Sequence, residues 1–245
     1  MPLTGIEIFK LLPKTNCGEC GVPTCLAFAM SLAAGKAELA ACPYVSEEAK
    51  AKLSEAAAPP ILPVTIGTGD KALKTGGETV MFRHEKRFEN PPAIAVLISD
   101  TMDEKEVDEK LERFQSLKYE RVGLVLYPEL VAVKDGSGDG GKFEALVKKV
   151  TAKTDCGIIL MSQNPDNLAL ALKSCAERKP LLYALTEENA ERMTTLAKEN
   201  SCPLAVKASS LEKLSELTDK LAQSGIKELV LDSGARALRQ ALKTR

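Results

Sequence analysis

The sequence predicts an α/β protein in which a small helical segment precedes a parallel β-sheet covered by helices. Six short apolar runs after residue 93 alternate with helical stretches. Runs such as VGLVL and GIIL are apolar throughout, as is typical of parallel strands covered by helices. Residues 1–57 differ, because they hold four of the seven cysteines and many alanines. The residues from Ala58 to Pro63 form a stiff, non-helical connection between the two parts.

The first part is expected to contain three short helices. Gly5–Leu12 has a short amphipathic pattern that ends at Pro13. Thr24 is suited to cap a helix that runs to Glu38. Ser46 opens another helix to about Ala57, with acidic residues in the first turn that suit the helix dipole.

Strands and helices are expected to alternate through the rest of the chain. Glycine-rich turns separate two strands at Leu62–Ile66 and Glu78–Arg83. Later strands are expected at Ile94–Ser99, Arg121–Tyr127, Gly157–Ser162, Leu181–Leu185, Leu204–Ala208 and Glu228–Asp232. The helices that follow them are expected at 103–117, 141–153, 165–178, 187–199, 210–223 and 235–243. Six βα units fit either a complete doubly wound sheet or most of a (β/α)8 barrel.

Composition excludes several classes of function. Hydrophobic residues make up 44% and charged residues 27% of the 245 positions, as in ordinary globular proteins. The net charge of −1 provides no attraction to nucleic acid or to an anionic membrane surface. The chain has no apolar run of about 18 residues and no signal-peptide pattern, so we expect it in the cytoplasm. There, clustered cysteines indicate metal or redox chemistry rather than disulfides.

Four cysteines in the first part have a spacing that indicates an iron–sulfur cluster. They are Cys17, Cys20, Cys25 and Cys42. The pattern is C-x2-C-x4-C-x16-C, followed by Pro43, and a [4Fe–4S] cube needs four thiolates, one per iron. Gly18 and Gly21 let the backbone wrap closely and direct amides at sulfur. A structural zinc site, which usually has two close cysteine pairs, and four unligated thiols are the alternatives. We therefore predict these four cysteines as the metal and cofactor ligands, and we predict no catalytic residue.

The cysteine segment and a second motif carry a resemblance to a known family. Residues 5–43, with the core NCGECGVPTC, resemble the N-terminal cluster domain of the large (gamma) subunit of corrinoid iron–sulfur proteins. The segment GGETVMFRHEKRFENPP at 76–92 resembles the same subunit and is more specific than the cysteine spacing. The resemblance implies a [4Fe–4S] domain at 1–57, a linker and β-hairpin cap at 58–93, and a TIM-type barrel at 94–245. About six of the eight barrel units are then present, and a cobamide-binding domain is expected beyond them.

The resemblance also implies a function in the acetyl-CoA (Wood–Ljungdahl) pathway of anaerobes. Members of the family carry a methyl group on cobalt from a methyl-tetrahydropterin, by way of a methyltransferase, to acetyl-CoA synthase. Their [4Fe–4S] cluster reduces Co(II) back to Co(I), and the four motif cysteines match the family without departure. The chain is thus expected to be a component of a methyl-transfer system, in a heterodimer with a small subunit, rather than a stand-alone catalyst. A cobalt-free electron-transfer subunit and a pterin-binding barrel methyltransferase are the alternatives.

Other candidate residues carry weaker signals. His84, the single histidine, is expected on the surface or as a cap of the barrel rather than in a metal site. The loop at 136–143 is close to a P-loop pattern, but Phe143 replaces the hydroxyl that would hold Mg²⁺. Asp100 and Asp232 end predicted strands, where barrel enzymes place catalytic groups and where a pterin could bind. Helix capping and loop solvation is the favoured interpretation for both. Three further cysteines without metal spacing are expected to be buried: Cys156, Cys175 and Cys202.

Overall fold

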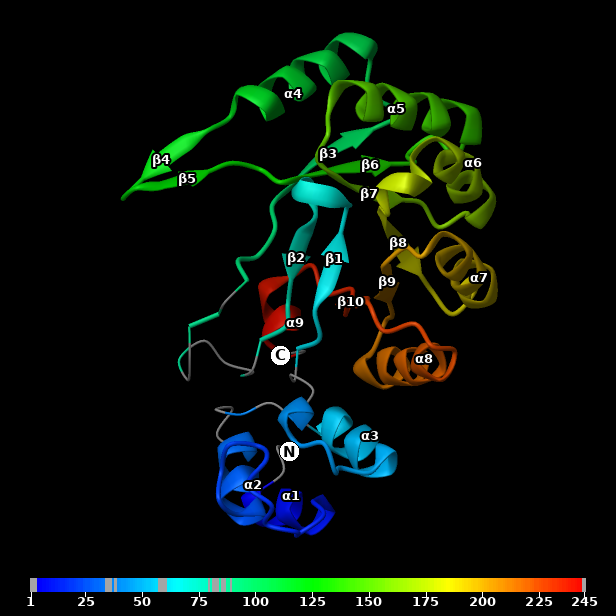
Figure 1. Ribbon diagram of the computed structural model, residues 1–245. Helices are drawn as coiled ribbons and strands as arrows, with labels where there is room; N and C mark the ends of the chain where they lie inside the picture. Colours follow the sequence, from blue (N-terminus) through cyan, green and yellow to red (C-terminus); the bar gives the residue numbers. More distant parts are fainter. Residues whose placement is uncertain are drawn as a thin grey trace. The chain divides into compact units, whose positions relative to one another are not determined.

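A computed structural model describes residues 4–33, 37, 39–56, 61–78, 80, 84, 87–88 and 90–243. The chain divides into two compact units, Met1–Pro60 and Ile61–Arg245 (Figure 1). The predicted strand Glu78–Arg83 and the last residues of the predicted helix 24–38 lie largely outside the described residues. Among the described residues, no helix is long and apolar enough to cross a bilayer.

The first unit, called the cysteine unit below, consists of short helices around a small apolar core. Its elements are α1 (Gly5–Leu11), α2 (Cys25–Ala33), the 3-10 helix η1 (Leu39–Ala41) and α3 (Glu47–Ala56). Thr4 and Glu7 form a reciprocal capping box at the start of α1, and the Ser46 hydroxyl accepts from Ala49 N at the start of α3. Ile8, Phe28 and Leu53 are buried between the helices. The three helices expected from the sequence are thus confirmed, with slightly different ends.

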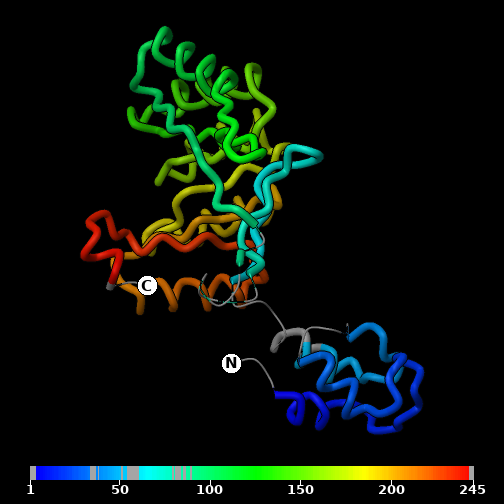
Figure 2. The backbone as a smooth tube through the Cα atoms, turned by 90° about the vertical axis from the view of Figure 1, so that its left-hand side faces the viewer, coloured from blue at the N-terminus to red at the C-terminus, as the bar shows by residue number. Residues whose placement is uncertain are grey.

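The second unit, called the sheet unit below, is built on six parallel strands that follow one another in chain order. They are β3 (Ala95–Ser99), β6 (Leu130–Lys134), β7 (Gly157–Met161), β8 (Leu181–Leu185), β9 (Leu204–Lys207) and β10 (Leu229–Asp232). The order across the sheet is β10-β9-β8-β7-β6-β3 (Figure 2). In a doubly wound sheet the order of the strands reverses partway across the sheet. The order here does not reverse, so the doubly wound alternative is wrong. The described sheet is open, with β3 and β10 as its edges.

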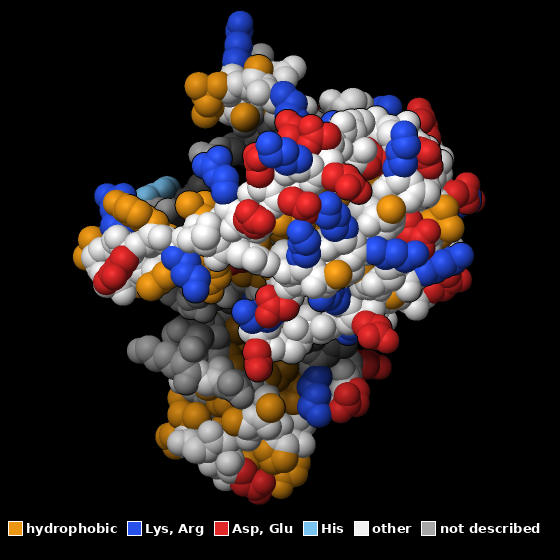
Figure 3. All heavy atoms as spheres, turned by 90° about the horizontal axis from the view of Figure 1, so that it is seen from above, with side chains coloured by type: hydrophobic (Ala, Val, Ile, Leu, Met, Phe, Trp, Pro, Cys, Tyr) orange, Lys and Arg blue, Asp and Glu red, His pale blue; other side chains and the backbone are white. Residues whose placement is uncertain are grey.

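One face of the sheet is covered by the connecting helices. They are α4 (Glu104–Ser116), α5 (Gly140–Lys153), α6 (Pro165–Cys175), α7 (Ala190–Asn200) and α8 (Leu211–Gln223), while the short α9 (Leu238–Lys243) follows β10. Ile98, Phe143, Leu160 and Met193 belong to the core between the sheet and the helices, and none of them is exposed to solvent. Outside, over α4 and α5, acidic and basic side chains are interspersed (Figure 3); Asp108, for example, pairs with Lys149 and Lys153. This outer face is therefore an ordinary solvated surface.

A short hairpin lies against the other face, at the ends where the strands begin. It consists of β1 (Val64–Ile66) and β2 (Leu73–Thr75), which pair antiparallel and are joined by the 3-10 helix η2 (Gly69–Lys71). Val64 and Ile66 pack with Leu130 and Leu181, the first residues of β6 and β8. The β1 strand was expected, but its partner is β2 rather than the predicted strand at 78–83.

The second strand of the sheet is not the predicted one. Arg121–Tyr127 was expected there, yet Leu124–Leu126 (β5) pairs antiparallel with Tyr119–Arg121 (β4) in a separate hairpin, and every residue of both strands is exposed. The sheet instead takes β6, which is buried over its first four residues. Both segments are apolar, so local periodicity does not separate them. A turn with positive φ at Val122 (51°) and Gly123 (76°) folds the first segment back on itself, and Leu130–Lys134 takes the place between β3 and β7.

Candidate iron–sulfur site

The four motif cysteines come from three places in the cysteine unit. Cys17 and Cys20 lie on the loop between α1 and α2, Cys25 is the first residue of α2, and Cys42 directly follows η1. Cys25 and Cys42 are only 6% and 4% exposed, whereas Cys20 is half-buried and Cys17 is exposed. The structure brings Cys20, Cys25 and Cys42 into contact with one apolar core. All four are free thiols.

Two glycines shape the loop that carries the first two cysteines. Gly18 and Gly21 have φ values of 76° and 81°, a region that side chains with a Cβ rarely adopt. The amide of Gly21 donates to the carbonyl of Gly18 at 3.0 Å, which closes a tight turn around Cys20. No heavy atom lies within 4 Å of the position that a Cβ would take at either glycine. Glycine is therefore needed at these two positions for the backbone conformation, and not because neighbouring atoms leave no room for a side chain.

Asn16 connects the start of this loop to the start of α2. Its side-chain Oδ1 accepts a hydrogen bond from the backbone amide of Cys25 at 2.8 Å. Asn16 itself has a φ of 48°, the left-handed conformation that Asn tolerates better than most residues. At the same helix start, the Thr24 hydroxyl accepts from Ala27 N at 3.1 Å, so Thr24 is confirmed as the cap. Sequence reasoning missed Asn16, whose only signal is an Asn placed directly before Cys17.

A second contact joins the same loop to the residues that follow Cys42. The Tyr44 hydroxyl donates to Glu19 Oε1 at 2.9 Å. This hydrogen bond, reinforced by the negative charge of Glu19, raises the pKa of the Tyr44 phenol above its ordinary value. The loop of Cys17 and Cys20 is thus tied at one end to Cys25 and in its middle to the segment of Cys42.

The donor set fits a [4Fe–4S] cluster. Within the described residues, no three or more His, Cys, Asp or Glu side chains form a group that could hold a metal ion. In a cube each thiolate binds a different iron, so the four sulfurs surround the cluster and need not all contact one metal ion. Three of the four free thiols contact one small core, and Asn16 and Tyr44 hold the loop that carries Cys17 and Cys20. The cysteine unit thus offers four sulfur ligands, one for each iron of a cube.

Asp100, at the carboxyl end of β3, is engaged by the loop that follows β6. Its Oδ1 accepts from the amides of Gly136 at 2.7 Å and Ser137 at 3.0 Å, and its Oδ2 accepts from Ser137 Oγ at 2.6 Å. The carboxylate therefore holds the glycine-rich loop in place. That loop leads into α5 through the cap Asp139, and Phe143 is fully buried in the core.

Asp232, at the carboxyl end of β10, belongs to a different group of side chains. It accepts from Tyr183 Oη at 2.6 Å, from Gly234 N at 2.8 Å and from Arg236 at 2.7 Å. The Arg236 guanidinium holds the pKa of the Asp232 carboxyl well below its usual range. Because β3 and β10 are opposite edges of the described sheet, Asp100 and Asp232 are not brought together there.

The remaining candidates agree with the sequence-based expectation except Cys156, which was expected to be buried. His84 is exposed. Cys156 is half-buried, and Cys175 and Cys202 are buried in the sheet unit. Burial raises the pKa of the Cys175 thiol to about 12 and that of Cys202 to about 11. These two thiols are therefore protonated at neutral pH.

Comparison with known proteins finds relatives along nearly the whole chain. The family model described as "CO dehydrogenase/acetyl-CoA synthase delta subunit" matches residues 63–245, and one described as "Putative Fe-S cluster" matches residues 12–44. The chain is 51% identical to the corrinoid/iron-sulfur protein large subunit of Moorella thermoacetica, over 99% of this chain and 54% of that protein. It is 40% identical to the acetyl-CoA decarbonylase/synthase complex subunit gamma of Methanopyrus kandleri, over 95% of this chain and 50% of that protein. It thus spans about half the length of the curated relatives it matches.

The family model that matches three quarters of the chain shows an α/β protein of the CO dehydrogenase/acetyl-CoA synthase family, preceded by a cysteine unit that matches the model described as "Putative Fe-S cluster". More particularly, the chain belongs to the family of corrinoid/iron-sulfur protein large, or gamma, subunits. The resemblance stated from the sequence is confirmed.

Proposed function

We propose that this chain is the cluster-bearing part of a corrinoid methyl carrier. The carrier would move a methyl group from methyl-tetrahydropterin, by way of a methyltransferase, to acetyl-CoA synthase. The observation that supports this most is the cysteine unit itself, with its four free thiols, in a chain 51% identical to a corrinoid/iron-sulfur protein large subunit. The bound cluster would supply single electrons that restore Co(II) to Co(I).

The residues of the cysteine unit would hold the cluster and control its surroundings. Cys17, Cys20, Cys25 and Cys42 would be its ligands. The apolar core around Cys25 and Cys42 keeps water from two of these sulfurs. Cys17 is exposed, so its side of the cluster would be open to an electron donor or acceptor. Asn16 and Tyr44 would keep the loop in the conformation that ligation needs.

The sheet unit would form most of a (β/α)8 barrel. Strands in chain order with their connecting helices on one face are typical of a barrel, and β1–β2 would cap its lower end. Two further βα units would join β3 to β10 and remove both open edges. The cobamide-binding domain is expected beyond these units. This organisation corresponds to a cluster domain at 1–57, a linker and cap at 58–93, and a barrel from 94.

The partner is proposed to be a second subunit with the same α/β fold. The family model that matches residues 63–245 is described for a delta subunit, whereas the curated relatives are large or gamma subunits. Both kinds of subunit would therefore share this fold, and the small subunit of the carrier would be the second one. A pterin methyltransferase and acetyl-CoA synthase would be transient partners.

Low-temperature EPR of anaerobically purified protein tests the cluster. We expect a reduced [4Fe–4S]⁺ signal in the wild-type chain and its loss in Cys20→Ala. Cys175→Ala is the matched control, because it removes a buried thiol from the sheet unit and should leave the signal unchanged. Zinc in place of iron by elemental analysis, with no EPR signal, would contradict the proposal.

Electron transfer to cobalt requires a separate measurement. Reduced wild-type protein is mixed with Co(II) cobinamide, and the Co(II) EPR signal is followed under anaerobic conditions. Loss of that signal with reduced wild type, but not with reduced Cys20→Ala, supports the reactivation function. A persistent Co(II) signal, with the cluster reduced, would favour an electron-transfer subunit that does not act on cobalt.

A further inference from the structure

The hairpin β4–β5, called the arm below, projects from the sheet unit as a separate ribbon (Figure 1). Its two strands pair only with each other, from Tyr119 opposite Leu126 to Arg121 opposite Leu124. The outer edge of each strand is therefore open in the described structure. Every residue from Leu117 to Tyr127 is exposed.

The arm is apolar in spite of this exposure. Its tip residue Val122 is 95% exposed, and Leu124 and Tyr119 are 63% and 62% exposed. Val125, Leu126 and Tyr127 each expose half or more of their surface. Single exposed apolar side chains are common, but a contiguous group marks an interaction surface. The same residues looked like a buried strand from the sequence, and the sheet unit does not bury them.

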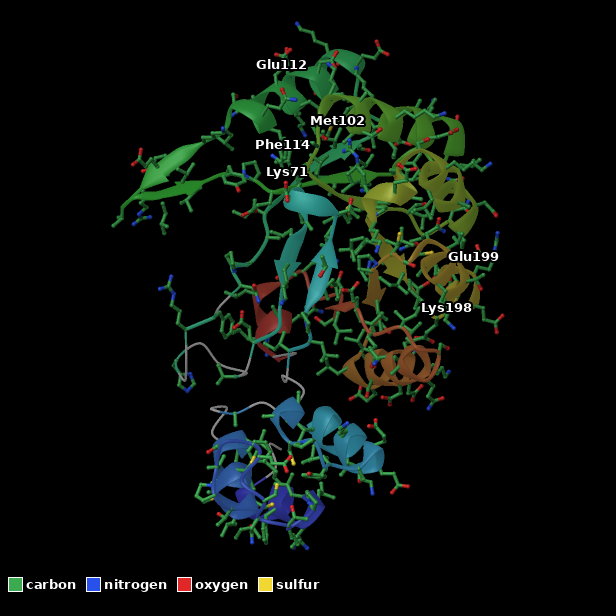
Figure 4. All side chains as sticks on the ribbon, viewed as in Figure 1. Lys71, Met102, Glu112, Phe114, Lys198 and Glu199 are labelled. Atoms are coloured by element: carbon green, nitrogen blue, oxygen red, sulfur yellow. The ribbon has the colours of Figure 1, made fainter. Side chains whose placement is uncertain are left out.

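A cleft lies at the base of the arm. It has a volume of about 530 Å³. Phe114 and Leu117 from α4 and its end, Leu73 from β2, and Val125 and Tyr127 from the arm line it. Phe114 and Lys71 lie close together there (Figure 4). The same cleft is also lined by charged side chains, such as Lys71 and Asp155. The arm and a cleft of mixed apolar and charged lining thus adjoin on one surface, an arrangement that lets two similar subunits each insert an arm beside the other's base.

The area of this surface suits a stable protein interface. Six large side chains that are at least half exposed offer roughly 100 Å² each, or about 600 Å² in all. The cleft adds to this, which brings the total near the ~800 Å² that each partner contributes to a standard interface. The arm carries Glu120 beside Arg121, so it lacks the cationic cluster that an anionic lipid surface would attract. A protein is the partner that these observations favour.

We propose that the arm docks on a second α/β unit of the same family and that the two units exchange arms. This inference rests on the proposed function, in which the partner subunit shares this fold. The family model described for a delta subunit matches residues 63–245, which include the arm. A related partner would therefore carry an equivalent arm and cleft, and each apolar arm would be covered by the other unit. The open strand edges add backbone hydrogen bonds across the contact.

The test measures binding between the full chain and the separately expressed small subunit, by sedimentation of the purified pair. In one variant, Val122→Glu and Leu124→Glu place charges on the arm. We expect the dissociation constant to rise at least about 100-fold, as for loss of central apolar anchors. Leu117→Glu in the cleft should also weaken binding, by at least about 10-fold. Leu211→Glu on α8 is the matched control, 44% exposed, and should bind as the wild type does.

Unchanged binding of the arm variant, or no pairing by the wild-type chain, would overturn the inference. Loss of binding in the arm variant alone, with Leu117→Glu unaffected, would overturn arm exchange. A wild-type homodimer that the arm variant disrupts would identify a second copy of this chain as the occupant instead. Circular dichroism melting and the cluster EPR signal show whether each variant is folded. A wild-type chain that pairs with the small subunit but gives no cluster EPR signal would contradict the proposed function and leave the arm inference standing.

Discussion

Replacing Asn16 tests whether the loop conformation, and not the cysteines alone, determines cluster binding. The Asn16 side chain holds the Cys25 amide at 2.8 Å, and its backbone is left-handed with φ at 48°. Asn16→Ala removes the hydrogen bond and places a residue with a poor left-handed propensity there. Asn16→Gly removes the same hydrogen bond, but glycine adopts this φ without steric cost.

The free-energy cost of the two variants is expected to differ by the strain of a left-handed alanine. Loss of the hydrogen bond costs about 1 kcal/mol, and the left-handed alanine costs a further 1–2 kcal/mol or so. Asn16→Ala should therefore disfavour the ligation-ready loop by about 2–3 kcal/mol, or roughly 30- to 150-fold. Asn16→Gly should lose about 1 kcal/mol, or roughly fivefold.

Competition with an iron chelator under anaerobic conditions measures this effect. Cluster occupancy is followed by visible absorbance as chelator is added, for both variants and the wild type. Asn200→Ala is the control, because its side chain donates to the Leu196 carbonyl within α7 of the sheet unit. Equal cluster retention by Asn16→Ala and the wild type would refute the role of the loop. Weaker retention by Asn16→Gly than by Asn16→Ala would refute the argument from strain.

Three further predictions concern the sheet unit, and urea unfolding measures each of them. Phe143→Ala empties a fully buried site and should cost about 3–5 kcal/mol; a cost below about 1 kcal/mol would mean that the core collapses around it. Gly157→Ala would place a Cβ 2.5 Å from Leu130 Cδ2, so a loss of about 1–3 kcal/mol is expected, and a neutral result would show that the leucine moves aside. Asp232→Asn should cost about 1 kcal/mol at pH 7, because its partner Arg236 is largely exposed. Since the folded pKa of Asp232 is lowered, its stabilisation is present above about pH 4 and is lost as the pH falls further; a difference that grows on acidification would contradict this sign.

The alternation of strands and helices was accessible from the sequence because its signals are local. Asp103 and Ser210, where two of the expected helix ranges begin, cap these helices by accepting from the amides three residues on. Five of the six predicted sheet strands form, with ends shifted by at most one residue. That the four cysteines ligate a cluster stays a prediction from their spacing. The structure adds the contacts of Asn16 and Tyr44 that hold the loop of Cys17 and Cys20.

Assignment of the second strand failed because two apolar segments stand close together in the chain. Arg121–Tyr127 and Leu130–Lys134 have similar composition, and either could pair with β3 by its own pattern. Only β6 has β3 and β7 as neighbours, with α5 packed over it. The exposure of the arm could not be predicted from the sequence either. An apolar run does not show whether the surface that buries it belongs to the same chain or to a partner.

By itself, the sequence determined the βα alternation, the small helical unit before it and the cysteines suited to a cluster. These follow from periodicity, capping and spacing, which act between residues close in the chain. Tertiary structure alone decided the order of the strands, the exposed arm and the contact between Asn16 and Cys25. Each of these depends on which distant segments meet, and that choice is made by burial and hydrogen bonding in the folded chain.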